Sequence, residues 1–209
     1  MFFSCFRVFV VAFDCSEMTS EADRQRLLQI ARDAISAYVN GVAAHGLSVS
    51  GGLARPGGAF VSIHHQGDLR GCIGHIEANR SLSSVVCECA VAACSADPRF
   101  PPVGAAELPG LEIEVSLLGP LEPVASPDDI EVGRHGLLVE QNGQRGLLLP
   151  QVASEWRWDR ETFLAHTCHK AGLPRDAWKQ GAKLWRFEAE VFGESSFNTK
   201  DTMDTKEEH

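Results

Sequence analysis

The chain has 209 residues, 44% of them hydrophobic and 22% charged, a balance typical of one globular domain that folds without a structural metal or disulfides. The formal net charge of -9 argues against a general nucleic-acid binder, since phosphate contacts require a concentration of Lys and Arg that no segment shows. The seven cysteines lack the paired spacing of a zinc site and the three-cysteine signature of a radical SAM enzyme, so the sequence predicts reduced thiols in the cytoplasm, no metal site and no cofactor.

The two ends of the chain are expected to lie outside the folded domain. Residues 1–17 begin with an apolar stretch that is too short to cross a bilayer and lacks a small-residue cleavage site, so no membrane association is expected. The segment from Met18 has the character of a natural start. We therefore expect residues 1–17 to be a mis-called or disordered extension, residues 18–194 to form the domain, and residues 195–209 to be a polar, disordered tail.

Local signals predict a series of helices and strands. Thr19 or Ser20 is placed to cap a first helix, and Asp159 is placed to cap the last one. A run of small and apolar residues predicts a buried helix between them that stops before Pro98. Asn142 and Gly143 form the strongest hairpin signal in the chain. The predicted helices lie at about 20–40, 82–96 and 159–172, and the predicted strands lie at 59–65, 69–76, 111–118, 136–141, 144–149 and 183–192.

The most informative segment is a hexapeptide that places a thiol between two glycines and beside a guanidinium. Glycines flanking Cys72 remove bulk, so both backbone and sulfur can approach a ligand, and Arg70 is placed to favour the thiolate or to bind an anionic substrate. The alternative is that Cys72 is an inert packing residue, as most buried cysteines are. The predicted ligand-binding residues in this segment are Leu69, Arg70, Gly71, Cys72, Ile73 and Gly74.

The hexapeptide lies in a predicted hairpin whose register decides which histidine accompanies the thiol. If residues 67–68 form a two-residue turn, His65 becomes a diagonal neighbour of Cys72, roughly 7 Å away between backbone positions. His64 and His75 then lie on the opposite face. A shift of one residue in the turn would send the His65 imidazole to the other face.

Two further residues are candidates for the site. Glu114 shares a predicted strand face with Glu112 and is a candidate ligand contact, although the solvated face of a strand is the simpler interpretation. His135 lies beside a glycine in a loop, which suits a proton carrier. The remaining cysteines between residues 18 and 194 are predicted to be core residues: Cys87, Cys89, Cys94 and Cys168.

Several uncommon strings follow the hexapeptide. They are DPRFPP at 97–102, LEIEVS at 111–116, IEVGRHGL at 130–137, RGLLLPQVA at 145–153 and KAGL at 170–173. With these strings, over about residues 20–194, the chain resembles the AMME chromosomal region (AMMECR) domain family, whose prokaryotic members are labelled protein A of the AmmeMemoRadiSam system.

The resemblance implies an α+β fold with antiparallel β-sheets flanked by helices. It implies one compact domain, with a larger part built from both chain ends and a smaller part contributed by the middle. A Memo-like protein and a radical SAM protein are the implied partners. The resemblance implies no reaction.

Two classes of function remain open. In the first, the hairpin is a rigid recognition element for an unknown small molecule, peptide or partner protein, and the chain is a binding or accessory component. In the second, the chain is a cysteine-dependent enzyme acting on a small or modified-peptide substrate, with Cys72 as nucleophile and His65 or His135 carrying protons. The first is favoured, because a thiol enzyme needs a placed base and no residue is a compelling one. Nucleotide cofactors have no support, since the chain lacks both a P-loop and a Rossmann glycine fingerprint.

Overall fold

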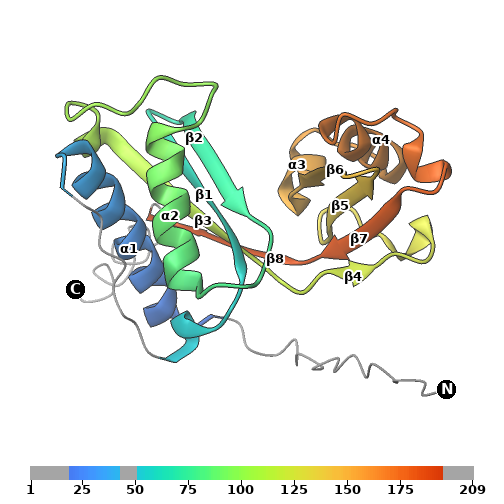
Figure 1. Ribbon diagram of the computed structural model, residues 1–209, viewed down its shortest axis with the longest axis horizontal. Helices are drawn as coiled ribbons and strands as arrows, with labels where there is room; N and C mark the ends of the chain where they lie inside the picture. Colours follow the sequence, from blue (N-terminus) through green and yellow to red (C-terminus); the bar gives the residue numbers. More distant parts are fainter. Residues whose placement is uncertain (1–18, 43–50, 195–209) are drawn as a thin grey trace, which may run out of the picture.

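The computed structural model describes residues 19–42 and 51–194, which form two α+β parts joined side by side (Figure 1). Each part holds a four-stranded antiparallel sheet, with strand order β2-β1-β3-β8 in the first sheet and β4-β7-β5-β6 in the second. The helices are α1 (Glu21–Val39), α2 (Leu82–Ser95), α3 (Pro150–Glu155) and α4 (Arg160–Lys170). The strands are β1 (Gly58–His65), β2 (Asp68–His75), β3 (Leu111–Leu118), β4 (Glu122–Pro123), β5 (Gly136–Gln141), β6 (Gln144–Leu148), β7 (Lys183–Phe187) and β8 (Ala189–Gly193). Short 3-10 turns lie at Gly51–Ala54, Leu108–Gly110, Pro127–Asp129 and Ala177–Lys179.

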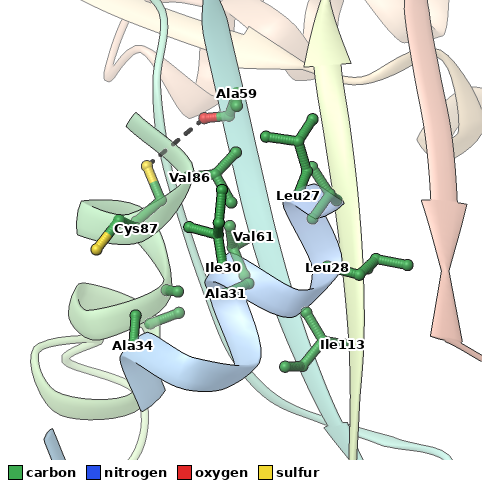
Figure 2. Close-up of a cluster of buried hydrophobic side chains, with 14 of the residues drawn as sticks. Leu27, Leu28, Ile30, Ala31, Ala34, Ala59, Val61, Val86, Cys87 and Ile113 are labelled. Carbon is green, nitrogen blue, oxygen red and sulfur yellow. Dashed lines mark hydrogen bonds between the residues drawn. The ribbon is translucent and has the colours of Figure 1, made fainter. Parts of the chain in front are cut away.

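The first part packs α1 and α2 against one face of the first sheet (Figure 1). Both helices begin at a capping serine: Ser20, as the sequence predicts, accepts a hydrogen bond from the backbone of Asp23, and Ser81 accepts one from the backbone of Ser84. Figure 2 shows apolar side chains of both helices meeting alternate residues of β1 and β3. The buried residues of this core include Leu27, Ile30, Ala31, Val61, Val86 and Ile113.

This packing leaves the other face of the first sheet without a helix of its own part. Successive strand residues point to opposite faces, so the residues between the core positions lie on the uncovered side. We call this side the open face, and define it by Phe60, Ser62, His64, Cys72, Gly74, Glu112, Glu114 and Ser116.

The second part is built around the β5–β6 hairpin. The backbone φ angles of Asn142 (53°) and Gly143 (80°) are both positive, as a tight two-residue turn of this kind requires, and this confirms the predicted turn. Helix α4 packs against β6 and β5 and buries Phe163 and Leu164. Asp159 caps α4 by accepting a hydrogen bond from the backbone of Thr162, as predicted from the sequence.

A third cluster of apolar residues joins the two parts. Leu138, Leu147 and Phe187 of the second part are buried, and Phe60 of the open face and Leu118 of β3 pack against them. One end of the open face is therefore covered by the second sheet. The end that carries Ser62, His64 and Glu114 contributes nothing to this cluster.

The predicted α+β fold with antiparallel sheets is confirmed. The larger part takes in both ends of the described chain, and the smaller part comes from the middle. Two local predictions differ from the structure. The single strand predicted at 183–192 is two strands, β7 and β8, because the chain leaves the second sheet at Glu188 and joins the first (Figure 1). The sequence does not predict helix α3, because its six residues are too few to show a helical period. The predictions for residues 1–17 and 195–209 lie outside the described residues.

Candidate functional site

One row of residues crosses the first sheet and carries the thiol. Cys72 of β2 pairs with Ser62 of β1, Ser62 pairs with Glu114 of β3, and Glu114 pairs with Gly193 of β8. Directly paired residues of an antiparallel sheet point to the same face. A thiol, a hydroxyl and a carboxyl group therefore lie in line on the open face.

The Cys72 side chain is partly exposed, and its surroundings hold it in place. Its sulfur accepts a hydrogen bond from the Ser62 hydroxyl at 3.3 Å. Its backbone N–H donates to the Asp97 carboxylate at 2.9 Å, although β2 is the edge strand of the sheet. The other free cysteines of the described chain, which include Cys89 and Cys168, are buried. Cys72 is thus the one free cysteine of the described residues that is not buried.

Asp97 is the main anchor of this edge. Its side chain is only 2% exposed, and besides the Cys72 N–H it accepts hydrogen bonds from the backbone N–H and the guanidinium of Arg99. The Arg99 hydrogen bonds are the largest cause that lowers the pKa of Asp97 well below its usual range. Arg99 also donates to the Cys72 carbonyl, at 3.4 Å. A charged, buried carboxylate therefore fixes the backbone of β2 behind the thiol.

Arg70 has a different role from the one predicted. Its guanidinium makes two hydrogen bonds to Glu107, at 2.8 and 3.1 Å, and donates to the carbonyl groups of Pro101 and Pro102. These partners occupy the donors that a thiolate or an anionic substrate would use. Arg70 therefore ties the 101–107 segment to β2, and the sulfur has no hydrogen bond from it.

The predicted register of the hairpin is wrong by one residue. The turn consists of Gln66 and Gly67, so His65 pairs with Asp68, and Arg70 forms a bulge between the pairs of Ile63 and His64. At the bulge, the Arg70 side chain is held by Glu107, Pro101 and Pro102, contacts that the local sequence of a hairpin does not reveal. Its consequence is that all side chains after it change face.

The correction exchanges the two histidines. His65 points to the helix-covered side, where its Nε2 atom lies against Gly110, so it is separated from Cys72 by the sheet. His64 lies on the open face, diagonal to Cys72 through Ser62. A thiol and an imidazole do share one face, but the imidazole belongs to His64. His75 lies on the side opposite the thiol, as predicted, since it pairs with the buried Ala59.

Both glycines of the hexapeptide lie where another group approaches the backbone too closely for a side chain. A Cβ atom at Gly71 would lie 2.2 Å from the backbone oxygen of Ala93 in α2, a distance that forces something to move. A Cβ atom at Gly74 would lie 2.2 Å from the ring of Phe60. Gly71 therefore permits the approach of α2 from behind, and Gly74 permits Phe60 to lie across β2 on the open face.

The two apolar residues of the hexapeptide lie on opposite faces of the first sheet. Leu69 pairs with His64 and is 39% exposed at the tip of the hairpin. Ile73 pairs with Val61 and packs against the helix-covered core. Of the six predicted ligand contacts, Leu69, Cys72 and Gly74 lie on the open face, whereas Gly71 and Ile73 face the helices.

A groove of about 320 Å³ lies next to the Glu114 end of the row. It is lined by His64, Gly67, Glu112, Ile113, Glu114, Gly193 and Glu194. Burial raises the pKa of Glu114, and the negative charge of Glu155 in α3 adds to that shift, while His64 opposes it. Glu114 is therefore a carboxyl group with a raised pKa, and it lies in a groove beside the imidazole of His64.

The second part contributes charges that act on the open face. Glu155 at the end of α3 acts on Glu114, and Lys170 at the end of α4 acts on Cys72. Partial burial lowers the pKa of the Lys170 ammonium; a negative charge on Cys72 opposes this shift and the positive charge of Arg99 adds to it. Lys170 of the second part and Arg99 thus both interact electrostatically with Cys72.

His135 lies in a different site. It is 7% exposed and lines a cavity of about 620 Å³ whose wall includes Arg134, Arg186 and Phe187 but no residue of the Cys72 row. Its Nδ1 atom accepts a hydrogen bond from the backbone N–H of Glu131 at 2.9 Å. Burial, followed by the two arginines, lowers the pKa of His135. The structure does not bring His135 to the thiol, so their predicted joint role lacks support from the geometry.

The remaining cysteine predictions are confirmed. Cys87, Cys89, Cys94 and Cys168 are buried, and burial raises the pKa of Cys89 to about 12 and that of Cys94 to about 11. In residues 19–42 and 51–194, no group of three or more His, Cys, Asp or Glu side chains is arranged to hold a metal ion.

Sequence reasoning missed several residues around the thiol: Ser62, His64, Asp97, Arg99 and Lys170. Asp97 and Arg99 belong to the string at 97–102, and Lys170 begins the string at 170–173. These strings carried the resemblance to a family, yet nothing in the local sequence places them beside Cys72.

The comparison with protein families settles which family this is. The family model AMMECR1 matches residues 28–192, which include the whole open face. The chain belongs to the AMMECR1 family. Among its relatives, a protein of Methanothermobacter thermautotrophicus is 49% identical over 144 residues, covering 66% of this chain and 75% of the relative. A protein of Aeropyrum pernix is 40% identical over 189 residues, covering 86% of this chain and 82% of the relative.

A solved structure supports the same assignment. The crystal structure of an uncharacterized protein from Pyrococcus horikoshii matches with a TM-score of 0.76 and 40% sequence identity, covering 81% of this chain and 90% of the other. The AMMECR1 fold described above is therefore similar to one observed in a crystal. Among the helices of the described ranges, none has the length and apolar character that a membrane span requires.

Proposed function

We propose that this AMMECR1-family chain is a binding or accessory component that recognises a small molecule or an extended peptide segment on the open face of its first sheet. The observation that carries the proposal is the placement of Cys72. The thiol is partly exposed on the open face, while Asp97 and α2 hold its strand from behind. Such a surface is rigid before a ligand arrives, which reduces the entropy lost on binding.

The partners of the sulfur favour recognition over catalysis. Among the described residues, the hydrogen bond to Cys72 Sγ comes from the Ser62 hydroxyl, which is no general base at neutral pH. The guanidinium predicted to stabilise a thiolate, that of Arg70, is occupied by Glu107 and two carbonyl groups. The site therefore offers donors, acceptors and an accessible groove more plainly than it offers an activated nucleophile.

One observation favours a second candidate, a cysteine-dependent enzyme. His64 shares the open face with Cys72, and the cations of Lys170 and Arg99 act on the thiol from outside the sheet. In such an enzyme the Cys72 thiol would give its proton to His64 and its sulfur would bond to the acyl carbon of a substrate. The leaving group would take that proton from His64 as its bond to carbon breaks.

The resemblance adds two partners to the proposal. A Memo-like protein and a radical SAM protein are proposed as the proteins with which this chain works. Support for them comes from the family label alone, so they are the first candidates for a direct binding experiment.

The test compares two changes at the Cys72 sulfur, its replacement by oxygen and its alkylation. Purified chain is used to capture the Memo-like protein, the radical SAM protein and a mixture of metabolites and peptides. We expect Cys72→Ser, which keeps the size of the side chain, to bind as the wild type does. We expect wild-type protein alkylated at Cys72 with N-ethylmaleimide to lose binding, because the adduct fills the open face.

The outcomes separate the two candidates. Loss of turnover in Cys72→Ser, with binding retained and a reaction product detected for the wild type, would establish the enzyme. Unchanged binding after alkylation would place the recognition surface away from the open face and overturn the proposal.

A further inference from the structure

A third pocket, which shares no lining residue with the Cys72 row, lies where the two parts of the molecule meet. Its volume is about 340 Å³, within the ~300–1,000 Å³ that is usual for small-molecule sites. It is formed by the 55–58 loop, the segment after β2, the crossing from β3 towards β4, and one residue of β6. The lining residues are Arg55, Pro56, Gly57, Gly58, Ile76, Glu77, Ala78, Leu82, Leu117, Leu118, Gly119, Pro120, Leu121 and Arg145.

The wall of this pocket is apolar and joins two cores. Leu82 and Leu117 belong to the core under the helices, whereas Ile76 and Leu118 pack in the cluster between the parts. Leu121 is 36% exposed at the pocket. A preformed apolar wall of this kind gains free energy by covering an apolar group of a ligand.

The two arginines at the pocket differ in their hydrogen-bond partners. Arg145 bonds Glu77 and Glu140 at 3.0 Å each, so its charge is matched. Arg55 is half-buried, and in the described part of the chain its side chain bonds the Thr19 hydroxyl at 3.2 Å but no carboxylate. Within residues 19–42 and 51–194, Arg55 is thus an arginine beside an apolar wall with no carboxylate on its guanidinium.

We propose that this pocket binds an amphipathic carboxylate, with its apolar tail against the leucines and its carboxylate on Arg55. A guanidinium forms two parallel, charge-assisted hydrogen bonds with a carboxylate. Such a pair selects a ligand by its negative charge and by the planar shape of its carboxylate. The site is independent of the open face, because none of its lining residues belongs to the Cys72 row.

The test uses decanoate as the probe and isothermal titration calorimetry as the measurement, on the full chain. 1-Decanol has the same apolar tail without the charge. We expect decanoate to bind at least about 10-fold more tightly than 1-decanol, since a charge-assisted pair contributes on the order of a factor of ten or more.

Three variants locate the binding. Arg55→Gln should weaken decanoate about 10-fold or more, whereas Arg55→Lys, which keeps the charge, should weaken it less. Ala78 is exposed at the pocket, so Ala78→Trp should fill the mouth without disturbing the fold and abolish binding of both probes. Arg26→Gln, an exposed site on α1 outside the pocket, is the matched control for charge and should change nothing.

Several results would overturn the proposal. Equal affinities for decanoate and 1-decanol would remove the role of the charge, and unchanged binding in Ala78→Trp would place the probe elsewhere. Cys72→Ser should bind decanoate as the wild type does, so failure here is separable from failure of the proposed function.

Discussion

The anchoring of β2 by Asp97 makes a quantitative prediction. Replacing Asp97 by Ala removes the acceptor of the Cys72 N–H, 2.9 Å away, and three hydrogen bonds from Arg99. The Arg99 side chain is 53% exposed, so its donors return to water at little cost. The Cys72 N–H is partly buried, and leaving it unpaired costs about 1–3 kcal/mol. We therefore expect Asp97→Ala to lower the free energy of unfolding by about 2–3 kcal/mol.

A matched series tests this reasoning. Asp97→Asn keeps one acceptor oxygen for the Cys72 N–H and loses the charge and the second acceptor oxygen, which faces the exposed Arg99, so we expect a smaller loss of about 1 kcal/mol. Asp68→Ala, at an exposed carboxylate in the hairpin, should stay within about 0.5 kcal/mol of the wild type. The assay is urea unfolding followed by circular dichroism. If Asp97→Ala cost no more than Asp68→Ala, or if Asp97→Asn cost as much as Asp97→Ala, the anchoring role would be refuted.

The same carboxylate sets a pH dependence. The pKa of Asp97 is lowered in the folded state, mainly by the hydrogen bonds from Arg99, so its stabilisation is present above the unfolded pKa of about 4 and is lost as pH falls below it. The difference in unfolding free energy between the wild type and Asp97→Asn should therefore shrink from pH 6 to pH 3. A difference that grows on acidification would contradict the assigned sign.

Three further predictions concern other residues. Gly71→Ala should lower the free energy of unfolding by at least about 1–3 kcal/mol, because its Cβ would press on the Ala93 backbone. Gly67→Ala has open space around its Cβ but a φ of 87°, so it should cost about 1 kcal/mol, and urea unfolding compares the two variants. Glu114→Gln should raise the melting temperature at pH 7–8 and not at pH 4, since burial raises the pKa of Glu114 and ionising it costs stability as pH rises; equal shifts at both pH values would count against this. Burial lowers the pKa of His135, so stability should fall as pH drops below about 6.5 in the wild type and fall less in His135→Gln, which thermal unfolding between pH 7 and 5 will decide.

Where local chemistry decides structure, the sequence predicted it. Ser20 and Asp159 cap helices because their side chains bond backbone groups three residues away, and Asn142 with Gly143 makes a turn that few other residues allow. The alternation in β3 predicted which of its faces is buried. Each of these signals lies within a few residues of its effect.

The geometry of the site depends on contacts that no local pattern contains. The bulge at Arg70 depends on Glu107, 37 residues away, and it decides that His64 rather than His65 accompanies the thiol. The Asp97 carboxylate reaches a backbone N–H across 25 residues, and Lys170 comes from the other part of the molecule. A one-residue error in register moves a side chain to the opposite face of the sheet. The sequence therefore identifies the hexapeptide but assigns the wrong histidine to the face of Cys72.

The proposed function depends most on the accessibility of Cys72 in the folded chain. Its direct test is alkylation by iodoacetamide under native conditions, with each cysteine followed by peptide mass spectrometry. We expect Cys72 to react at least about 100-fold faster than Cys89, Cys94 and Cys168, which are buried and need unfolding before they react. If Cys72 stayed unmodified until denaturant was added, the open face would be closed to ligands and the account of this site would be contradicted.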